Sequence, residues 1–152
     1  MPGSPGGTGL AMDSALRVSA ELENLAVVRC FVETTAAALG ADPEAADDLV
    51  HAADELAANI IQHGYRGRPG QVEIEMAKAQ DELVICLRDQ APLFAPTLVP
   101  PADLTLPLEK RPLGGLGVHL ARQFTDSMSY RVTSAGGNEL TLRKKLNQGG
   151  NT

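Results

Sequence analysis

Cysteine is scarce in this sequence, since only Cys30 and Cys86 occur among its 152 residues. Both lie inside apolar segments and outside any CxxC pair, which predicts two buried free thiols and no metal site built on them. The three histidines, His51, His63 and His119, do not form a metal cluster by their spacing either. A chain of this size can bury a sufficient core without disulfides or a structural metal.

Positive charge is also in short supply. Thirteen lysines and arginines stand against nineteen aspartates and glutamates, which gives a formal net charge of −6 and an isoelectric point near 5.0. A general nucleic-acid-binding protein needs a basic surface that neutralises phosphates. We therefore expect protein or small-molecule partners and no nucleic acid.

Long hydrophobic runs are absent as well. No apolar run approaches the roughly 20 residues of a membrane span, and the first residues lack the basic and apolar regions of a signal peptide. We therefore expect a cytoplasmic protein with no membrane partner.

The composition divides the chain into three parts. Residues 1–13 are rich in glycine and proline and contain little that could pack, which predicts a disordered N-terminal extension. Residues 14–147 have the length of one ordinary domain, and residues 148–152 form a short tail.

The first part of the domain predicts an edge strand and two helices. Apolar and polar residues alternate over 15–20, as in a strand. A first helix is predicted from an N-cap at Asn24 to a stop at Gly40. A second helix is predicted from Asp42, which can cap it and is followed by proline, to about His63.

The rest of the domain predicts strands around a long loop. Residues 72–76 alternate and 83–87 are apolar throughout, which predicts a strand with one wet face and then a central strand. Residues 90–112 contain six prolines and are interpreted as a lid loop. Helical spacing returns over 116–124, and 128–142 predict a hairpin. About three helices on one face of a mainly antiparallel or mixed sheet make an α+β two-layer sandwich.

Polar side chains recur with helical spacing near the end of the second helix. Glu55, Asn59 and His63 are each four residues apart, so they lie close to one line on a helix face. Apolar residues occupy a separate stripe: Leu49, Ala53, Leu56 and Ile60. The pattern indicates a helix that borders a site, although the spacing alone leaves open a solvated Glu55 and a surface Asn59.

Two later features can also carry chemistry. Asp89 ends the apolar strand. An ordinary turn aspartate would also fit this position. Gly114, Gly115 and Gly117 lie where the last helix should begin. Free backbone amides at a helix N-terminus can hold phosphate oxygens, but the same glycines would suit a plain turn.

Together these segments resemble the successive ATP-site motifs of the bacterial anti-sigma serine-protein kinases. That family belongs to the superfamily of gyrase, histidine-kinase and MutL ATPases, and the resemblance covers about residues 16–146. The matching residues, in order, are Glu55-x-x-x-Asn59-x-x-x-His63-x-Tyr65, Asp89 with Pro92 and Phe94, and Gly114-Gly115-Leu116-Gly117 with Asp126 downstream.

The resemblance implies a role for each motif. Asn59 would coordinate, through its amide oxygen, the Mg²⁺ that bridges the ATP phosphates. Glu55 would orient or deprotonate the attacking hydroxyl. Asp89 would accept a hydrogen bond from the adenine amino group. The cluster of Gly114, Gly115 and Gly117 would let the backbone approach the phosphates.

The resemblance also implies a function. An anti-sigma factor of this kind would be a homodimer that sequesters a sigma factor and phosphorylates a serine or threonine of a STAS-type anti-anti-sigma partner. Arg29, near the rim of the first helix's apolar stripe, is either a solvated surface cation or a partner contact.

One departure from the family motivates a second hypothesis. The adenine motif of the family usually reads Asp-x-Gly, whereas this chain has Ala91 at the third position. A methyl group there penalises a positive φ and occupies space beside the base. The alternative is a non-catalytic or weakly nucleotide-binding partner-switching module on the same fold.

Overall fold

The computed structural model describes residues 14–93, 121 and 123–146. Its strands are β1 (Ser14–Ser19), β2 (Gln71–Ala79), β3 (Glu82–Asp89), β4 (Ser127–Val132) and β5 (Asn138–Lys145). They form one sheet in the order β1-β2-β3-β5-β4, with every neighbouring pair antiparallel. The predicted edge strand, central strand and terminal hairpin are confirmed.

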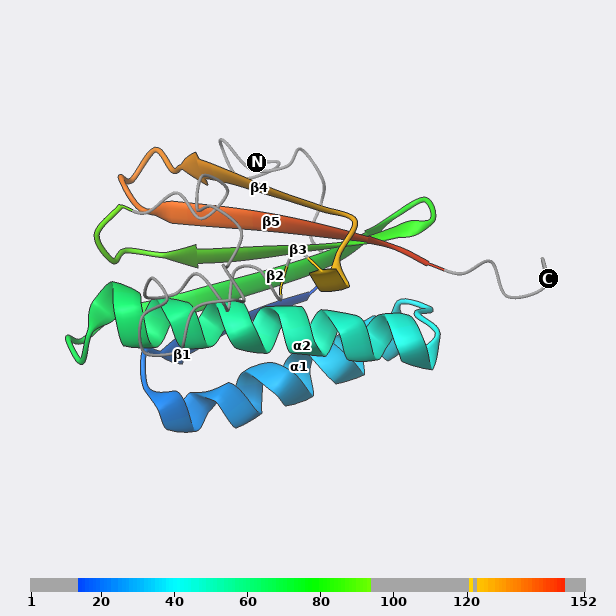
Figure 1. Cartoon of the computed structure of the whole chain (residues 1–152), viewed down its shortest axis with the longest axis horizontal. Coiled ribbons are helices and arrows are strands. Elements are labelled where there is room, and N and C mark those ends of the chain that lie inside the picture. Colours follow the sequence, from blue (N-terminus) through cyan, green and yellow to red (C-terminus); the bar gives the residue numbers. More distant parts are fainter. Residues whose placement is uncertain (1–13, 94–120, 122, 147–152) are drawn as a thin grey trace, which may run out of the picture.

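Two long helices cover one face of this sheet (Figure 1). They are α1 (Leu25–Ala38) and α2 (Pro43–Asn59). Ala121, Gln123 and Phe124, the described part of the predicted third helix, are also helical. The predicted α+β two-layer sandwich is therefore confirmed, and its described strands are all antiparallel. None of the described helices is long and apolar enough to cross a membrane.

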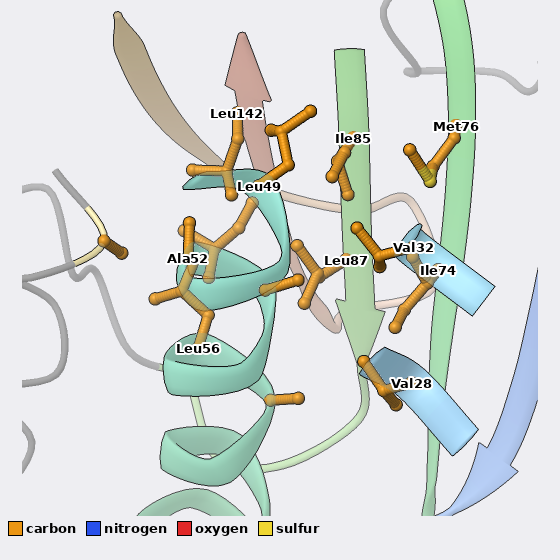
Figure 2. Close-up of a cluster of buried hydrophobic side chains, with 14 of the residues drawn as sticks. Val28, Val32, Leu49, Ala52, Leu56, Ile74, Met76, Ile85, Leu87 and Leu142 are labelled. Carbon is orange, nitrogen blue, oxygen red and sulfur yellow. The ribbon is translucent and has the colours of Figure 1, made fainter. Parts of the chain in front are cut away.

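The core fills the space between the helices and the sheet (Figure 2). Most of its side chains come from α1, α2 and the three central strands, and those labelled in Figure 2 are at most 1% exposed. They are Val28, Val32, Leu49, Ala52, Leu56, Ile74, Met76, Ile85, Leu87 and Leu142. This apolar contact holds α2 against β3 and β5, whose ends carry the site described below.

The two helices begin in different ways. The carboxylate of Asp42 accepts a hydrogen bond from the backbone N–H three residues later, so the predicted cap of α2 is confirmed. Asn24 is the N-cap residue of α1, as predicted, but its side chain makes no capping hydrogen bond to the helix. Asn24 Nδ2 instead donates to the backbone oxygen and the hydroxyl of Ser19, both at 2.9 Å, and ties the helix entry to β1.

The end of α2 also differs from the prediction of one helix to about His63. The α-helix stops at Asn59 and continues as a π-helix, η2 (Ile60–Tyr65), which ends at Arg66 with a φ of 55°. A π turn contains more residues than an α turn, so α spacing cannot be extended past Asn59. Such turns are rare and occur frequently at functional sites.

The prediction of two buried thiols is right for Cys86 and wrong for Cys30. Cys86 lies on β3 beside the hydroxyl of Thr141, 3.5 Å away, and burial raises the pKa of its thiol. Cys30 is exposed. It lies midway between Val28 and Val32, which both face the core, and therefore points away from it.

The face of the sheet opposite the helices carries a row of alternating charges. Five residues lie directly opposite one another on neighbouring strands: Arg17, Glu73, Arg88, Glu139 and Arg131. Opposite charges in such pairs stabilise strand pairing. Glu139 is the most buried member at 1% exposure, and each of its oxygens accepts from a different arginine. The distances are 2.6 Å to Arg88 and 2.5 Å to Arg131.

The row predicts unequal effects of two matched substitutions. Glu139→Gln removes the charge that compensates two arginines, so we expect the free energy of unfolding in urea to fall by about 3 kcal/mol. Glu73→Gln is the control, because Glu73 lies at the surface and pairs with the exposed Arg17 at 2.5 Å. It should change the same quantity by less than about 1 kcal/mol. Equal losses in the two variants would contradict this account.

Candidate functional site

A cavity of about 400 Å³ lies where the end of α2 and η2 meet the end of β3 and the start of β5. These ends of the elements lie toward the left of Figure 1. The described lining residues of the cavity are Leu56, Asn59, Ile60, His63, Gly64, Arg66, Arg68, Asp89, Pro92, Leu93, Tyr130, Asn138 and Leu140. Apolar walls with a few polar groups are typical of small-molecule sites, and this volume falls within their usual range.

The cavity brings together some of the predicted site residues. Asn59 and Asp89, which are distant in sequence, both line it, and His63 lines it as well. Glu55 is half-buried one turn before Asn59 and does not belong to the described lining. The predicted glycine cluster, 114–117, lies outside the described residues, as does most of the predicted lid.

The predicted separation of a chemical side and an apolar side of the helix is wrong at this end. Leu56 and Ile60 line the cavity together with Asn59 and His63. Leu56 lies three residues before Asn59 in α2, so the two side chains are neighbours on the helix surface, and the residues after Asn59 follow a π turn that the α-helical spacing did not include. The cavity therefore has an apolar wall and polar groups from the same helix.

Asp89 is a buried carboxylate, with 5% of its surface exposed. Its Oδ1 accepts two hydrogen bonds, from the backbone N–H of Ala91 at 2.9 Å and from Asn138 Nδ2 at 2.8 Å. Burial raises the pKa of Asp89 above its ordinary value, and these two hydrogen bonds oppose that rise. Asp89 is thus a solvent-shielded acceptor at the wall of the cavity rather than an ordinary surface turn residue.

Ala91 does not have the two effects expected of its methyl group. Its φ is not positive, since Arg66 and Gln80 are the non-glycine residues with positive φ in the described part of the chain. Ala91 is buried but is not among the described lining residues. A Cβ placed on Gly64 would lie 3.1 Å from the Ala91 Cβ, so this methyl group packs against the backbone of η2.

Asn138 is a site residue that the sequence analysis missed. It was given no role within the predicted hairpin, yet it is the first residue of β5 and is only 5% exposed. Besides Asp89, its Nδ2 donates to the backbone oxygens of Ala91 at 3.1 Å and Pro92 at 3.3 Å. The sequence contains one signal for this position. Asn138, Leu140 and Leu142 are two residues apart in a strand, so all three side chains are expected on the face that packs against the core.

Tyr65 fixes the backbone around the cavity. Its hydroxyl donates to the Gln71 backbone oxygen and accepts from the Gln90 N–H, both at 2.8 Å. The bonds join the end of η2 to the start of β2 and to the residue after Asp89. Gly70 makes room for the ring, because a Cβ there would lie 2.1 Å from Tyr65 Cε1.

Arg29 lies on α1, away from the cavity lining. Its guanidinium is exposed and pairs with Asp54 of α2 at 2.9 Å. An exposed pair of this kind stabilises the fold only slightly.

Residues 18–144 match the family model described as a histidine kinase-like ATPase domain. The chain belongs to this family. Curated relatives named serine-protein kinase RsbW, from Bacillus mycoides (strain KBAB4) and Bacillus cereus (strain Q1), are each 27% identical over 117 residues. The matches cover 74% of this chain and 73% of each relative.

A solved structure supports the same fold. The RsbU and RsbW domains of Rv1364c from Mycobacterium tuberculosis match with a TM-score of 0.60 and 22% sequence identity. The match covers 88% of this chain but only 33% of that longer one. The family resemblance inferred from the sequence is therefore confirmed.

The contact between Gly64 and Ala91 predicts a coupling between two substitutions. Gly64→Ala gains up to about 1 kcal/mol of helix propensity but crowds the Ala91 methyl group. In an Ala91→Gly background the crowding is gone, so Gly64→Ala should be more favourable there by about 1 kcal/mol. Urea unfolding of the four proteins of this cycle measures the difference. Additive effects would show that the two residues do not press on each other.

Proposed function

We propose that this protein is an anti-sigma regulatory factor with serine/threonine protein kinase activity. It binds Mg-ATP in the cavity, phosphorylates a STAS-type anti-anti-sigma partner and sequesters a sigma factor. The observation that carries the proposal is the meeting of Asn59 and Asp89 at one cavity, in a chain of the histidine kinase-like ATPase family with relatives named serine-protein kinases. The homodimer and the cytoplasmic location are part of the same proposal.

The base of the nucleotide would lie against Asp89. A buried, ionised carboxylate accepts hydrogen bonds and donates none, which suits the exocyclic amino group of adenine. Leu56, Ile60 and Leu140 supply apolar surface in the same lining for a flat ring. Arg66 and Arg68 add positive charge there, which favours an anionic ligand in a chain of net charge −6.

The donor set of the cavity fits a magnesium ion held mainly by its nucleotide. Mg²⁺ prefers oxygen ligands and is commonly bound through one or two protein groups together with substrate phosphates. Asn59 offers a neutral amide oxygen, so the phosphates would supply the negative charge. When bound, the ion neutralises charge on the phosphates. The proposed glycines Gly114, Gly115 and Gly117 would contact the same phosphates through the backbone.

Glu55 would act on the partner rather than on the nucleotide. It lies one α-helical turn before Asn59 and outside the described lining, where a hydroxyl of a docked protein could approach. In the transfer, the hydroxyl oxygen forms a bond to the γ-phosphorus, the bond from that phosphorus to the β-γ bridging oxygen breaks, and the hydroxyl proton passes to Glu55. The exposed Arg29 is the proposed contact with a partner protein.

The partner-switching module without catalysis is the second candidate. Its motivation was Ala91, and that motivation is weaker because Ala91 has an ordinary φ and packs against Gly64. The kinase is therefore our first choice, and nucleotide binding separates the two candidates.

Calorimetric titration with Mg-ATP tests the proposed site. The wild-type protein should bind, and both Asn59→Ala and Asp89→Asn should weaken binding at least about tenfold, because each removes one polar contact worth about 1.4 kcal/mol or more. Arg29→Ala, which changes a residue away from the cavity, is the control and should bind normally. No binding by the wild-type protein at millimolar ATP would favour the second candidate.

Phosphate transfer to a STAS-domain partner tests the role of Glu55. Glu55→Ala should slow transfer by about 100-fold or more while leaving the affinity for ATP unchanged, since a general base acts on the hydroxyl. Asp47→Ala is the control, because it removes an exposed carboxylate of the same helix that does not contact Arg29. Unchanged transfer by Glu55→Ala would remove Glu55 from the mechanism.

A further inference from the structure

A chain of hydrogen bonds runs along the wall of the cavity from β4 through β5 to β3. Tyr130 Oη donates to Asn138 Oδ1 at 2.6 Å, and Asn138 Nδ2 donates to Asp89 Oδ1 at 2.8 Å. Asn138 and Asp89 are directly opposed in the antiparallel pairing of β3 and β5. All three side chains line the cavity. A ligand that contacts Asp89 would therefore meet a carboxylate whose position is already fixed by the amide of Asn138.

The surroundings of Asn138 determine which way its amide group points. Three acceptor oxygens surround Nδ2, namely the Asp89 carboxylate and the backbone carbonyls of Ala91 and Pro92. The hydroxyl of Tyr130 donates to Oδ1. A flipped amide would place its carbonyl oxygen against these three acceptor oxygens. The amide therefore has one satisfactory orientation, and it presents a donor to Asp89.

This arrangement leaves one oxygen of Asp89 for a ligand. Within the described part of the chain, the donors from Asn138 and Ala91 both bind Oδ1. Asp89 lines the cavity, and Oδ2 is the oxygen whose acceptor capacity these two donors leave for a ligand. Two donors on one oxygen favour the ionised form of the carboxyl group, which can accept hydrogen bonds but cannot donate one.

We propose that Asn138, oriented by Tyr130, is a positioning residue that keeps Asp89 an acceptor-only group and so makes the cavity select 6-amino purines over 6-oxo purines. The proposal rests on the proposed function, because it names the base selectivity of the same nucleotide site. Adenine offers an amino donor at the position where hypoxanthine offers a carbonyl acceptor. An ionised Asp89 attracts the first and repels the second, whereas a protonated Asp89 could donate to the second.

Loss of the Asn138 donor should change Asp89 in a defined direction. Burial raises the pKa of Asp89, and the hydrogen bond from Asn138 is the largest opposing effect. Without it the pKa rises further, so a greater fraction of Asp89 is protonated as the pH falls. Among the described lining residues, the other charged or titratable groups are His63, Arg66, Arg68 and Tyr130. Arg88 and Glu139, the sequence neighbours of the pair, pair with each other on the opposite face of the sheet.

The test compares ATP with ITP, which differ at the 6-position of the purine. In calorimetric titrations from pH 6 to 8, the wild-type protein should bind ATP at least about tenfold more tightly than ITP, with a ratio that varies little with pH. Asn138→Leu, similar in size but without a donor, should reduce the ratio to below about threefold and make ITP binding stronger as the pH falls. Tyr130→Phe should lie between the two.

Three further variants isolate the effect of the donor. Asn138→Thr returns a hydroxyl donor and should restore part of the selectivity. Thr141→Val removes another buried polar group of β5, one that contacts Cys86 on the other face of the sheet, and should behave as the wild type. Adding His63→Gln to Asn138→Leu should leave the pH dependence of that variant unchanged, which would exclude the imidazole as its source.

A carbon-detected NMR titration of the Asp89 carboxyl group, without nucleotide, gives a readout that is independent of binding. The midpoint should move to higher pH in Asn138→Leu than in the wild type, with both proteins folded by their amide spectra. An unchanged midpoint, or an unchanged ATP to ITP ratio, would overturn the proposal while leaving ATP binding intact. A wild-type protein that binds neither nucleotide would overturn both the proposed function and the selectivity, whatever the midpoint.

Discussion

The cost of burying the Asp89 carboxylate is the constraint on which the arrangement of the site depends. A buried charge without hydrogen bonds would be strongly destabilising. Here it is compensated by an amide from β5 and by the backbone N–H of Ala91 in the turn after β3. Gln90, which lies between Asp89 and Ala91, donates its backbone N–H to the hydroxyl of Tyr65. The compensation of one charge thus fixes the end of β3, the start of β5 and the end of η2 relative to one another.

Much of the fold could be predicted because its signals are local. Alternating residues gave the strands, the apolar run of β3 gave the centre of the sheet, and the cap at Asp42 gave the start of α2. The π turn could not be predicted in this way, since the pattern was extended with α-helical spacing. Cys30 was misplaced because an apolar neighbourhood in sequence does not state which side of a helix a residue occupies.

The site was predictable to the extent that a motif carried it. Asn59 and Asp89 were named from a family pattern, and the fold brings both to one cavity. Asn138 was missed because it resembles a turn residue locally, while its contacts are with a strand about fifty residues earlier. The effect of Ala91 was misjudged for a similar reason. Whether a methyl group obstructs a site depends on what lies beside it, and here a glycine of η2 lies there.

The charged row on the far face of the sheet has a consequence for folding fidelity. The pair Arg88 and Glu139 is next to the pair Asp89 and Asn138 in the register of β3 and β5. The first pair forms an ion pair on one face of the sheet, and the second lines the site on the other face. A slip of one residue between β3 and β5 would turn every side chain of the slipped strand to the wrong face. It would also separate Arg88 from Glu139, so the buried carboxylate would lose one of its two arginine partners. The ion pair therefore disfavours a misaligned sheet. When Arg88 and Glu139 pair correctly, Asp89 and Asn138 are also opposite each other at the wall of the cavity.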